Sequence, residues 1–202
     1  MLKNYWFGLD DMDNLNCRKQ ESSSLSLLAM KLTVCPFLLL FTLNVFAQES
    51  GDRGYIVKVG DEAPPFKFNL ASGKTISSKK LKGKVVMLQF TASWCSVCKK
   101  EMPFIESEIW QVYKDKGLAL YGVDYDEPLE KVEAFAKSTG ITYPIALDPG
   151  GEVFALFARK QSGVTRNVIM DREGNIVFLT RLFDRTEFEE MKEVIKQLLQ
   201  ED

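Results

Sequence analysis

Hydrophobic and polar residues follow changing patterns between residues 54 and 202, a stretch that reads as one domain. Residues 85–90 form a largely apolar run that begins with two β-branched valines, and residues 118–123 form a second run. Short apolar runs bounded by glycine or polar residues are typical of buried strands. The segment 96–116 between them has helical composition and ends before Gly117. These patterns predict a strand, a helix and a second strand in succession.

Two hairpins are predicted on either side of this unit. Before it, residues 66–70 alternate apolar and polar side chains, and Gly73 turns the chain back toward residues 74–76. After it, residues 168–171 and 176–180 flank a short polar turn that contains glycine. Such a turn between two apolar runs indicates a β-hairpin.

Three further helices complete the predicted fold. Pro128 stands at the first position of a helix that ends at Gly140, and residues 152–158 form a short helix. Thr186 and Glu189 form a capping box before a last helix whose apolar positions keep helical spacing. This order of elements predicts an α/β fold, in which helices flank a central mixed β-sheet.

The first fifty residues follow a different pattern. The apolar run 32–47 follows Lys31 and ends in small or β-branched residues. It is shorter than the roughly 20 apolar residues of a membrane-spanning helix, and its end resembles a signal-peptidase site. We expect residues 30–47 to be a signal peptide, or alternatively an uncleaved membrane anchor, and the mature protein to be extracytoplasmic. Residues 1–29 show no sustained period, and we interpret them as an unstructured leader or the product of a misassigned start codon.

Charge and composition exclude several classes of function. The chain has 26 Lys and Arg against 28 Asp and Glu, so it has no positive excess that would bind nucleic acid. It has no histidine, which excludes Ser-His-Asp triads, Cys-His nucleophiles and metal sites that contain histidine. The chemistry must therefore use cysteine, carboxylates, hydroxyls, lysine or arginine, and we expect neither a metal nor a cofactor.

The positions of the four cysteines point to redox chemistry. Cys17 and Cys35 precede the predicted domain, whereas Cys95 and Cys98 form a close pair within it. A zinc site needs further ligands that the domain does not contain, so a dithiol or disulfide pair is favoured over structural cysteines. A cysteine at a helix N-terminus faces free amide donors and the positive end of the helix dipole, which favour the thiolate. We therefore expect Cys95 to be the nucleophile and Cys98 the resolving thiol.

One segment also carries a resemblance to a known family. Residues 91–103, with the sequence TASWCSVCKKEMP, and the lead-in VGDEAP at 59–64 resemble thioredoxin-fold proteins. The similarity is greatest to the TlpA/ResA-like extracytoplasmic thiol–disulfide oxidoreductases of the redoxin branch, and it covers residues 58–200. It implies a thioredoxin fold whose central four-stranded sheet has an added N-terminal β-hairpin. It also implies a redox-active disulfide between Cys95 and Cys98, client proteins with disulfides, and a membrane-embedded electron donor.

The resemblance implies roles for three neighbours of the cysteine pair. Glu101 matches an acidic residue near the pair that takes the proton from Cys98; the alternative is a solvated acid on the helix surface. Trp94 would shield the pair, with ordinary packing as the alternative. Pro103 would kink the helix, because proline lacks the N–H that the helix needs.

Two positions depart from the family pattern. Gln89 stands where many thioredoxins have a buried aspartate, and an amide cannot take up a proton at neutral pH. Thr165 stands where the family has a cis-proline, so we expect a trans peptide bond before it. We expect the Thr165 hydroxyl to donate to the Cys95 thiolate and Arg166 to add positive charge, with plain surface residues as the alternative.

The predicted function is the reduction of disulfides in extracytoplasmic client proteins. The sequence does not fix the direction of exchange, so an oxidase or isomerase stays open, and two alternatives of other classes remain open as well. In a thiol-dependent peroxidase of the redoxin type, Thr165 and Arg166 would both face the thiolate. In a non-catalytic thioredoxin-like binding module, the cysteine pair would be a structural disulfide.

Overall fold

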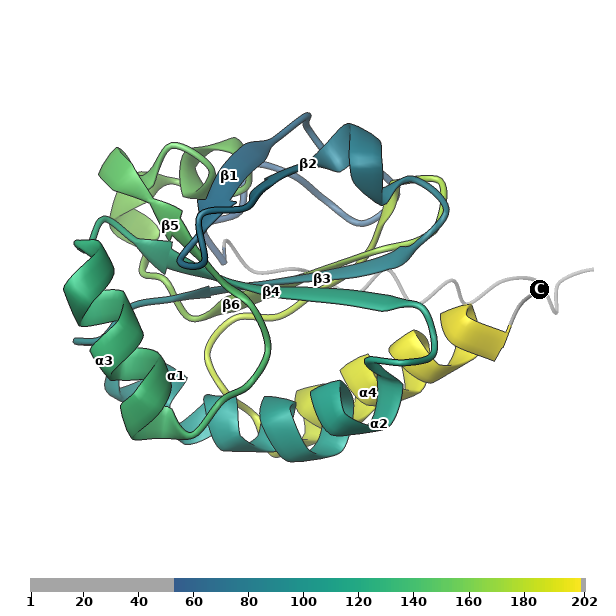
Figure 1. Ribbon diagram of the computed structural model, residues 1–202. Helices are drawn as coiled ribbons and strands as arrows, with labels where there is room; N and C mark the ends of the chain where they lie inside the picture. The colour runs from purple at the N-terminus through teal and green to yellow at the C-terminus, as the bar shows by residue number, and fades with distance from the viewer. Residues whose placement is uncertain (1–52, 201–202) are drawn as a thin grey trace, which may run out of the picture. The chain divides into compact units, whose positions relative to one another are not determined.

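The computed structural model (Figure 1) describes residues 53–200 of the chain. The predicted leader (1–29), the predicted signal peptide or anchor (30–47), Cys17 and Cys35 lie outside the described residues. Within the described part, no helix is both long enough and apolar enough to cross a bilayer.

A seven-stranded mixed sheet forms the centre of the fold, with the order β2-β1-β5-β4-β3-β6-β7. The strands are β1 (Lys67–Leu70), β2 (Thr75–Ser77), β3 (Val85–Thr91), β4 (Leu118–Tyr125), β5 (Ile145–Asp148), β6 (Arg166–Met170) and β7 (Ile176–Leu179). The adjacent strands β3, β4 and β5 are parallel, whereas every other neighbouring pair is antiparallel. The predicted mixed sheet is confirmed.

Strand β5 was missing from the sequence-based expectation, which placed four strands in the central sheet. It pairs with β4 on one side and with β1 on the other, so it joins the hairpin β1–β2 to the rest of the sheet. Its four residues begin directly after Pro144 and end in an aspartate. Three apolar residues in a row are too few to distinguish a buried strand from other apolar segments.

Helices cover one face of this sheet. They are α1 (Ser96–Phe104), which continues through a π-helical segment (Ile105–Trp110) into α2 (Gln111–Tyr113), then α3 (Leu129–Thr139) and α4 (Arg185–Gln200). The connections from β3 to β4 and from β4 to β5 step in the same direction across the sheet. Because such crossovers are right-handed, α1 and α3 lie on the same face, as Figure 1 shows.

The opposite face is covered by short 3₁₀ turns and by the described segment that precedes β1, whose Ile56 N–H donates to the Phe157 carbonyl at 2.9 Å. The turns are Ser78–Leu81, Pro149–Gly151, Phe154–Leu156 and Lys160–Ser162. Phe90 of β3 packs edge-on against Phe154 at a centroid distance of 5.3 Å. The predicted helix over 152–158 is therefore only a short turn.

Two predicted helix starts differ from the observed ones. Pro128 has an extended backbone (ψ 152°) and precedes α3 rather than occupying its first position. The capping box of Thr186 and Glu189 is not where α4 begins. Instead the Asp184 carboxylate accepts the backbone N–H of Glu187 at 3.0 Å. An aspartate at this position both satisfies a free amide and complements the positive end of the helix.

Strand β3 carries the polar groups that define the candidate site. All seven of its residues are buried. Since successive side chains in a strand point to opposite faces, Phe90 faces the 3₁₀ turns while Gln89 and Thr91 face α1. The Thr91 hydroxyl accordingly contacts the Met102 sulfur of α1 at 3.6 Å. Two polar side chains thus lie beneath the helix that the cysteines begin.

Candidate active site

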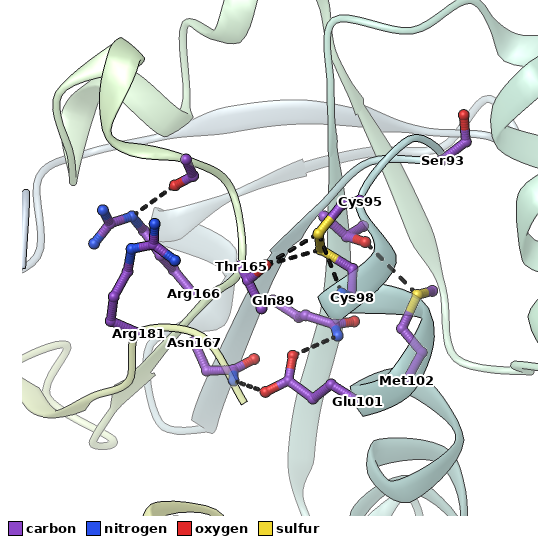
Figure 2. Close-up of a disulfide and its surroundings, with 12 residues drawn as sticks. Gln89, Ser93, Cys95, Cys98, Glu101, Met102, Thr165, Arg166, Asn167 and Arg181 are labelled. Atoms are coloured by element: carbon purple, nitrogen blue, oxygen red, sulfur yellow. Dashed lines mark hydrogen bonds between the residues drawn. A yellow bond between two sulfur atoms is a disulfide. The ribbon is translucent and has the colours of Figure 1, made fainter. Parts of the chain in front are cut away.

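Cys95 and Cys98 form a disulfide at the N-terminus of α1 (Figure 2), with their Cα atoms 5.3 Å apart. After β3 the chain makes a tight turn, closed by a 3.1 Å hydrogen bond from the Cys95 N–H to the Ala92 carbonyl. Cys95 is the N-cap of α1, and its sulfur accepts the Cys98 N–H at 3.1 Å. An amide donor and the positive end of a helix therefore act on the outer sulfur, and both favour a thiolate there.

The two cysteines differ in their access to solvent. Cys95 is 8% exposed, whereas Cys98 is completely buried. Trp94, which precedes the pair, is 62% exposed. The packing alternative for Trp94 is therefore wrong, because its ring is not part of the core; whether it shields the disulfide stays a prediction.

Thr165 lies directly against both sulfur atoms. Its hydroxyl oxygen is 3.0 Å from the Cys95 sulfur and 3.3 Å from the Cys98 sulfur. The residue is buried, so it is not a plain surface residue. The geometry places a hydroxyl where it can donate to whichever sulfur carries negative charge. Its predicted role toward the Cys95 thiolate stays a prediction.

Arg166 does not join Thr165 at the disulfide. Its guanidinium lies 4.4 Å from the centre of the Tyr55 ring and donates to the carbonyls of Gly163 and Ser162, each at 3.0 Å. Figure 2 shows its side chain directed away from the sulfur atoms. Neighbouring residues of an extended segment point to opposite faces, so Thr165 and Arg166 cannot both face one sulfur. Arg166 therefore does not bring its charge to the Cys95 sulfur as expected. The pairing of Thr165 and Arg166 at the thiolate, which the peroxidase alternative requires, is not formed.

Glu101 lies one turn after Cys98 on α1 and is only 1% exposed. The Asn167 amide donates to one carboxylate oxygen at 2.7 Å, and the Gln89 amide donates to the other at 3.2 Å. The alternative of a solvated surface acid is therefore wrong. Residues three apart share a helix face, so the carboxyl and the Cys98 sulfur lie on the same side of α1.

The environment of Glu101 changes its protonation. Burial raises the pKa of Glu101 to about 7, because a carboxylate loses its hydration in this position, while the hydrogen bonds from Asn167 and Gln89 partly oppose the rise. A carboxyl with a pKa in this range gains and loses a proton near neutral pH, which is what a proton acceptor or donor in thiol chemistry requires.

Tyr143 fixes the orientation of Gln89. Its hydroxyl donates to the Gln89 carbonyl oxygen at 2.6 Å, which leaves the amide nitrogen of Gln89 facing Glu101. Burial raises the pKa of Tyr143 well above its ordinary value, so it remains a neutral donor. Gly122 makes room for the ring, since a Cβ at this position would lie 3.3 Å from a Tyr143 ring carbon.

Sequence reasoning did not identify Asn167 or Tyr143 as site residues. Both are distant from the cysteines in sequence, and β6 was predicted to begin only at Val168. The one available signal in the sequence was a polar residue next to an apolar strand pattern, because Asn167 directly precedes the run 168–170. The structure shows that this polar side chain is buried.

Pro103 lies inside α1, and the π-helical segment begins two residues later. Since proline has no N–H, the helix lacks one of its regular hydrogen bonds at this point. The change from α-helical to π-helical geometry here is the local irregularity that accompanies the proline.

Comparison with known proteins agrees with this geometry. A sequence profile of the AhpC/TSA family matches residues 59–179. The chain belongs to the AhpC/TSA family. It is 34% identical over 130 residues to the thiol-disulfide oxidoreductase ResA of Bacillus thuringiensis subsp. konkukian, which covers 62% of this chain and 73% of that protein. It is 33% identical over 121 residues to ResA of Bacillus subtilis, covering 60% and 66% respectively.

Solved structures show the same likeness. The solution structure of a candidate protein disulfide isomerase from Bacteroides thetaiotaomicron has a TM-score of 0.72 and 58% identity, over 73% of this chain and 94% of that chain. A candidate thiol:disulfide interchange protein DsbE from Chlorobium tepidum has a TM-score of 0.63 and 26% identity, over 71% and 99%. The predicted resemblance, the thioredoxin-like α/β fold and the class of enzyme, a thiol–disulfide oxidoreductase, are confirmed.

Proposed function

We propose that this protein reduces disulfide bonds in extracytoplasmic client proteins, with Cys95 as the attacking thiolate and Cys98 as the resolving thiol. The observation that carries the proposal is the asymmetry of the pair at the start of α1. Cys95 is 8% exposed and receives an amide hydrogen bond, whereas Cys98 has no exposed surface. A large disulfide substrate therefore meets only the outer sulfur.

In the first step, the Cys95 thiolate attacks one sulfur of the client disulfide. A mixed disulfide forms between Cys95 and the client, and the other client sulfur leaves as a thiolate. In the second step, the Cys98 thiolate attacks the Cys95 sulfur, which closes the Cys95–Cys98 bond and releases the remaining client sulfur. Two electrons have then passed from the cysteine pair to the client.

Glu101 is the proposed proton acceptor for Cys98 in the second step. Its burial, its position one turn from Cys98 and its pKa of about 7 support this role. The Cys98 side chain has no exposed surface in the disulfide, so water is a poor alternative acceptor. Thr165 is proposed to stabilise the sulfur that carries negative charge, from its position 3.0 Å from Cys95 and 3.3 Å from Cys98.

The predicted signal peptide at 30–47 supports a location outside the cytoplasm. Each turnover leaves the pair oxidised, so a reductant must restore the two thiols before the next cycle. The resemblance to the TlpA/ResA-like proteins suggests a membrane-embedded donor of electrons for this step.

Trapping tests the proposed function. The Cys98→Ser variant lacks the resolving thiol and should accumulate mixed disulfides with client proteins when expressed with its leader in a bacterial host. The Cys95→Ser variant, with the same number of cysteines, is the matched control and should accumulate none. Absence of adducts on Cys98→Ser would instead support a binding module with a structural disulfide, and equal adducts on both variants would contradict the assigned roles.

A further inference from the structure

A second buried carboxyl group, Asp124, lies at the carboxyl end of β4, and the exchange chemistry above does not use it. The side chain of Asp124 is completely buried. Neither of its carboxylate oxygens receives a hydrogen bond from any residue in the range 53–200. A buried carboxylate that accepts no hydrogen bond is strongly disfavoured. We therefore expect Asp124 to be protonated and to donate this proton to a nearby acceptor.

The position of Asp124 in the sheet places it close to the active-site turn. Asp124 pairs in register with Thr91, the last residue of β3, across the parallel strands. Register partners point to the same face of a sheet, and Thr91 contacts Met102 of α1. Asp124 therefore lies on the face that α1 covers, beside the strand end from which the turn to Cys95 departs.

Glu127, three residues after Asp124, binds this turn directly. One of its carboxylate oxygens accepts the Ser93 N–H at 2.5 Å, and the other accepts the Ser93 hydroxyl at 2.6 Å. Ser93 belongs to the turn Ala92–Cys95, which presents Trp94 and Cys95. A single half-buried carboxylate thus holds both the backbone and the side chain of a residue in the active-site turn.

The backbone between the two acids allows this contact. Asp126 has φ 54°, a left-handed conformation that aspartate tolerates better than most residues, and its carboxylate accepts the Gly150 N–H at 2.7 Å. The chain therefore bends sharply between Asp124 and Glu127.

The charges around Asp124 favour its protonated form. Burial and the negative charge of Glu127 raise the pKa of Asp124 to about 7. On the neighbouring strands, its register partners Thr91 of β3 and Leu147 of β5 carry no charge. Glu127 is the charged group whose interaction with Asp124 raises its pKa.

We propose that Asp124 and Glu127 are a pair of positioning residues that share one proton and hold the active-site turn. The Asp124 carboxylic acid donates to a Glu127 oxygen, and Glu127 holds Ser93 and thereby the turn that carries Trp94 and Cys95. A carboxylate oxygen has two lone pairs, so Glu127 can accept from Asp124 and from Ser93 together. When Asp124 ionises, two adjacent carboxylates repel each other and the hold on Ser93 weakens. The consequence for catalysis rests on the proposed function of Cys95, whereas the hold on Ser93 does not.

The Ser93 amide proton reports on the pair directly. Its NMR chemical shift in the oxidised protein should titrate between pH 5.5 and 8.5 with a midpoint near 7. Asp124→Asn keeps a donor toward Glu127 but cannot ionise, so the resonance should stay constant. Asp115→Asn makes the same change at an exposed position outside this machinery; it is the matched control, and its Ser93 resonance should titrate as in the wild type.

Two outcomes overturn the proposal: a constant shift in the wild type, or a titration that persists in Asp124→Asn and therefore belongs to Glu101. Should Asp124→Asn fold poorly, Glu127→Gln replaces it. Loss of the negative charge that raises the pKa of Asp124 should move the midpoint below that of the wild type, and an unmoved midpoint contradicts the pairing.

The rate of disulfide reduction distinguishes a failure of this proposal from a failure of the proposed function. Asp124→Asn and the wild type should reduce a disulfide substrate at equal rates at pH 6, where both hold the turn. At pH 8 the variant should be about fivefold faster, the factor that one ordinary hydrogen bond is worth. If no protein reduces the substrate while the Ser93 titration behaves as expected, the proposed function fails and the positioning pair stands. Equal rates at both pH values overturn its role in catalysis.

Discussion

The two sides of the disulfide have very different surroundings. On the outer side, Cys95 has some exposed surface and follows Trp94, which is 62% exposed. The Cys95 sulfur has two hydrogen-bond partners, the Cys98 N–H and the Thr165 hydroxyl. On the inner side, the completely buried Cys98 lies on the same helix face as Glu101, which receives hydrogen bonds from side chains of β3 and β6.

This difference suggests a division of labour between the two sulfurs. The outer surroundings stabilise negative charge on sulfur and leave it accessible, which suits attack on a large substrate. The inner surroundings disfavour charge but contain one group that exchanges a proton near pH 7, which suits a thiol that must ionise only when the mixed disulfide is in place. The predictions below test each side in turn.

The largest expected effect comes from removing the inner acid. Glu101→Gln keeps the shape of the side chain but cannot take the proton from Cys98, so resolution of the mixed disulfide should slow by about 10²- to 10⁴-fold. Single-turnover reduction of a fluorescent disulfide substrate at pH 7 measures this rate. Glu133→Gln, on the exposed surface of α3, should react like the wild type. A Glu101→Gln protein that resolves at the wild-type rate would show that the inner acid does not act on Cys98.

The second prediction concerns the stability of the oxidised protein as a function of pH. The folded-state pKa of Glu101 is raised from 4.5 to about 7, so the folded protein keeps a proton that the unfolded chain releases in this range. The contribution to stability is present below pH 4.5 and is lost as the pH rises to 7, by about 3 kcal/mol. Urea unfolding at pH 4.5 and pH 8 measures it.

The raised pKa of Asp124 adds a loss of the same sign, so Glu101→Gln should reduce the difference between the two pH values without abolishing it. An identical pH dependence in Glu101→Gln would contradict the assignment of a raised pKa to this residue.

The third prediction concerns the amide donors of the inner side. Asn167→Leu removes the 2.7 Å hydrogen bond that opposes the effect of burial, so the pKa of Glu101 should rise further. The pH midpoint of mixed-disulfide resolution should move upward by about one unit, the equivalent of one hydrogen bond to a charged group. Thr180→Val, which removes the other partner of the Asn167 amide but keeps its bond to Glu101, is the control and should leave the midpoint in place.

The outer and inner sides also differ in how far the sequence predicts them. Cys95, Cys98 and their place at a helix start follow from one contiguous segment, because a buried strand, a turn and a helix are all local patterns. Burial of Glu101 does not follow from this segment, where it stands beside two lysines. It depends on Asn167 and Gln89, which two different strands bring together under α1.

The fold shows the same limit. Strands β3 and β4 are long enough for their hydrophobic pattern to be recognised, whereas β5 becomes a strand only through its pairing with β4 and β1. Arg166 was placed at the sulfurs because it follows Thr165 in sequence, but the alternation of an extended backbone turns it to the opposite side. The sequence shows which residues are adjacent in the chain, whereas the backbone geometry decides which of their side chains face the site.

The smallest expected effect lies on the outer side. Thr165→Val removes the hydroxyl from both sulfurs and conserves the shape of the side chain. The pH midpoint of Cys95 alkylation should move upward by about half a unit to one unit, since one hydrogen bond to the thiolate is lost. Thr142→Val, at an exposed site far along the chain, controls for the loss of a hydroxyl as such. An unmoved midpoint in Thr165→Val would show that the hydroxyl does not stabilise the thiolate.

The most direct test of the division between the two sulfurs is competitive alkylation of the reduced, full-length protein. Iodoacetamide in limiting amount at pH 7, followed by mass spectrometry of the peptide that contains both cysteines, gives the labelling rate of each sulfur separately. The account predicts that Cys95 is labelled at least about 10²-fold faster than Cys98, from its exposure and its thiolate character. Equal labelling of the two cysteines, or faster labelling of Cys98, would contradict it.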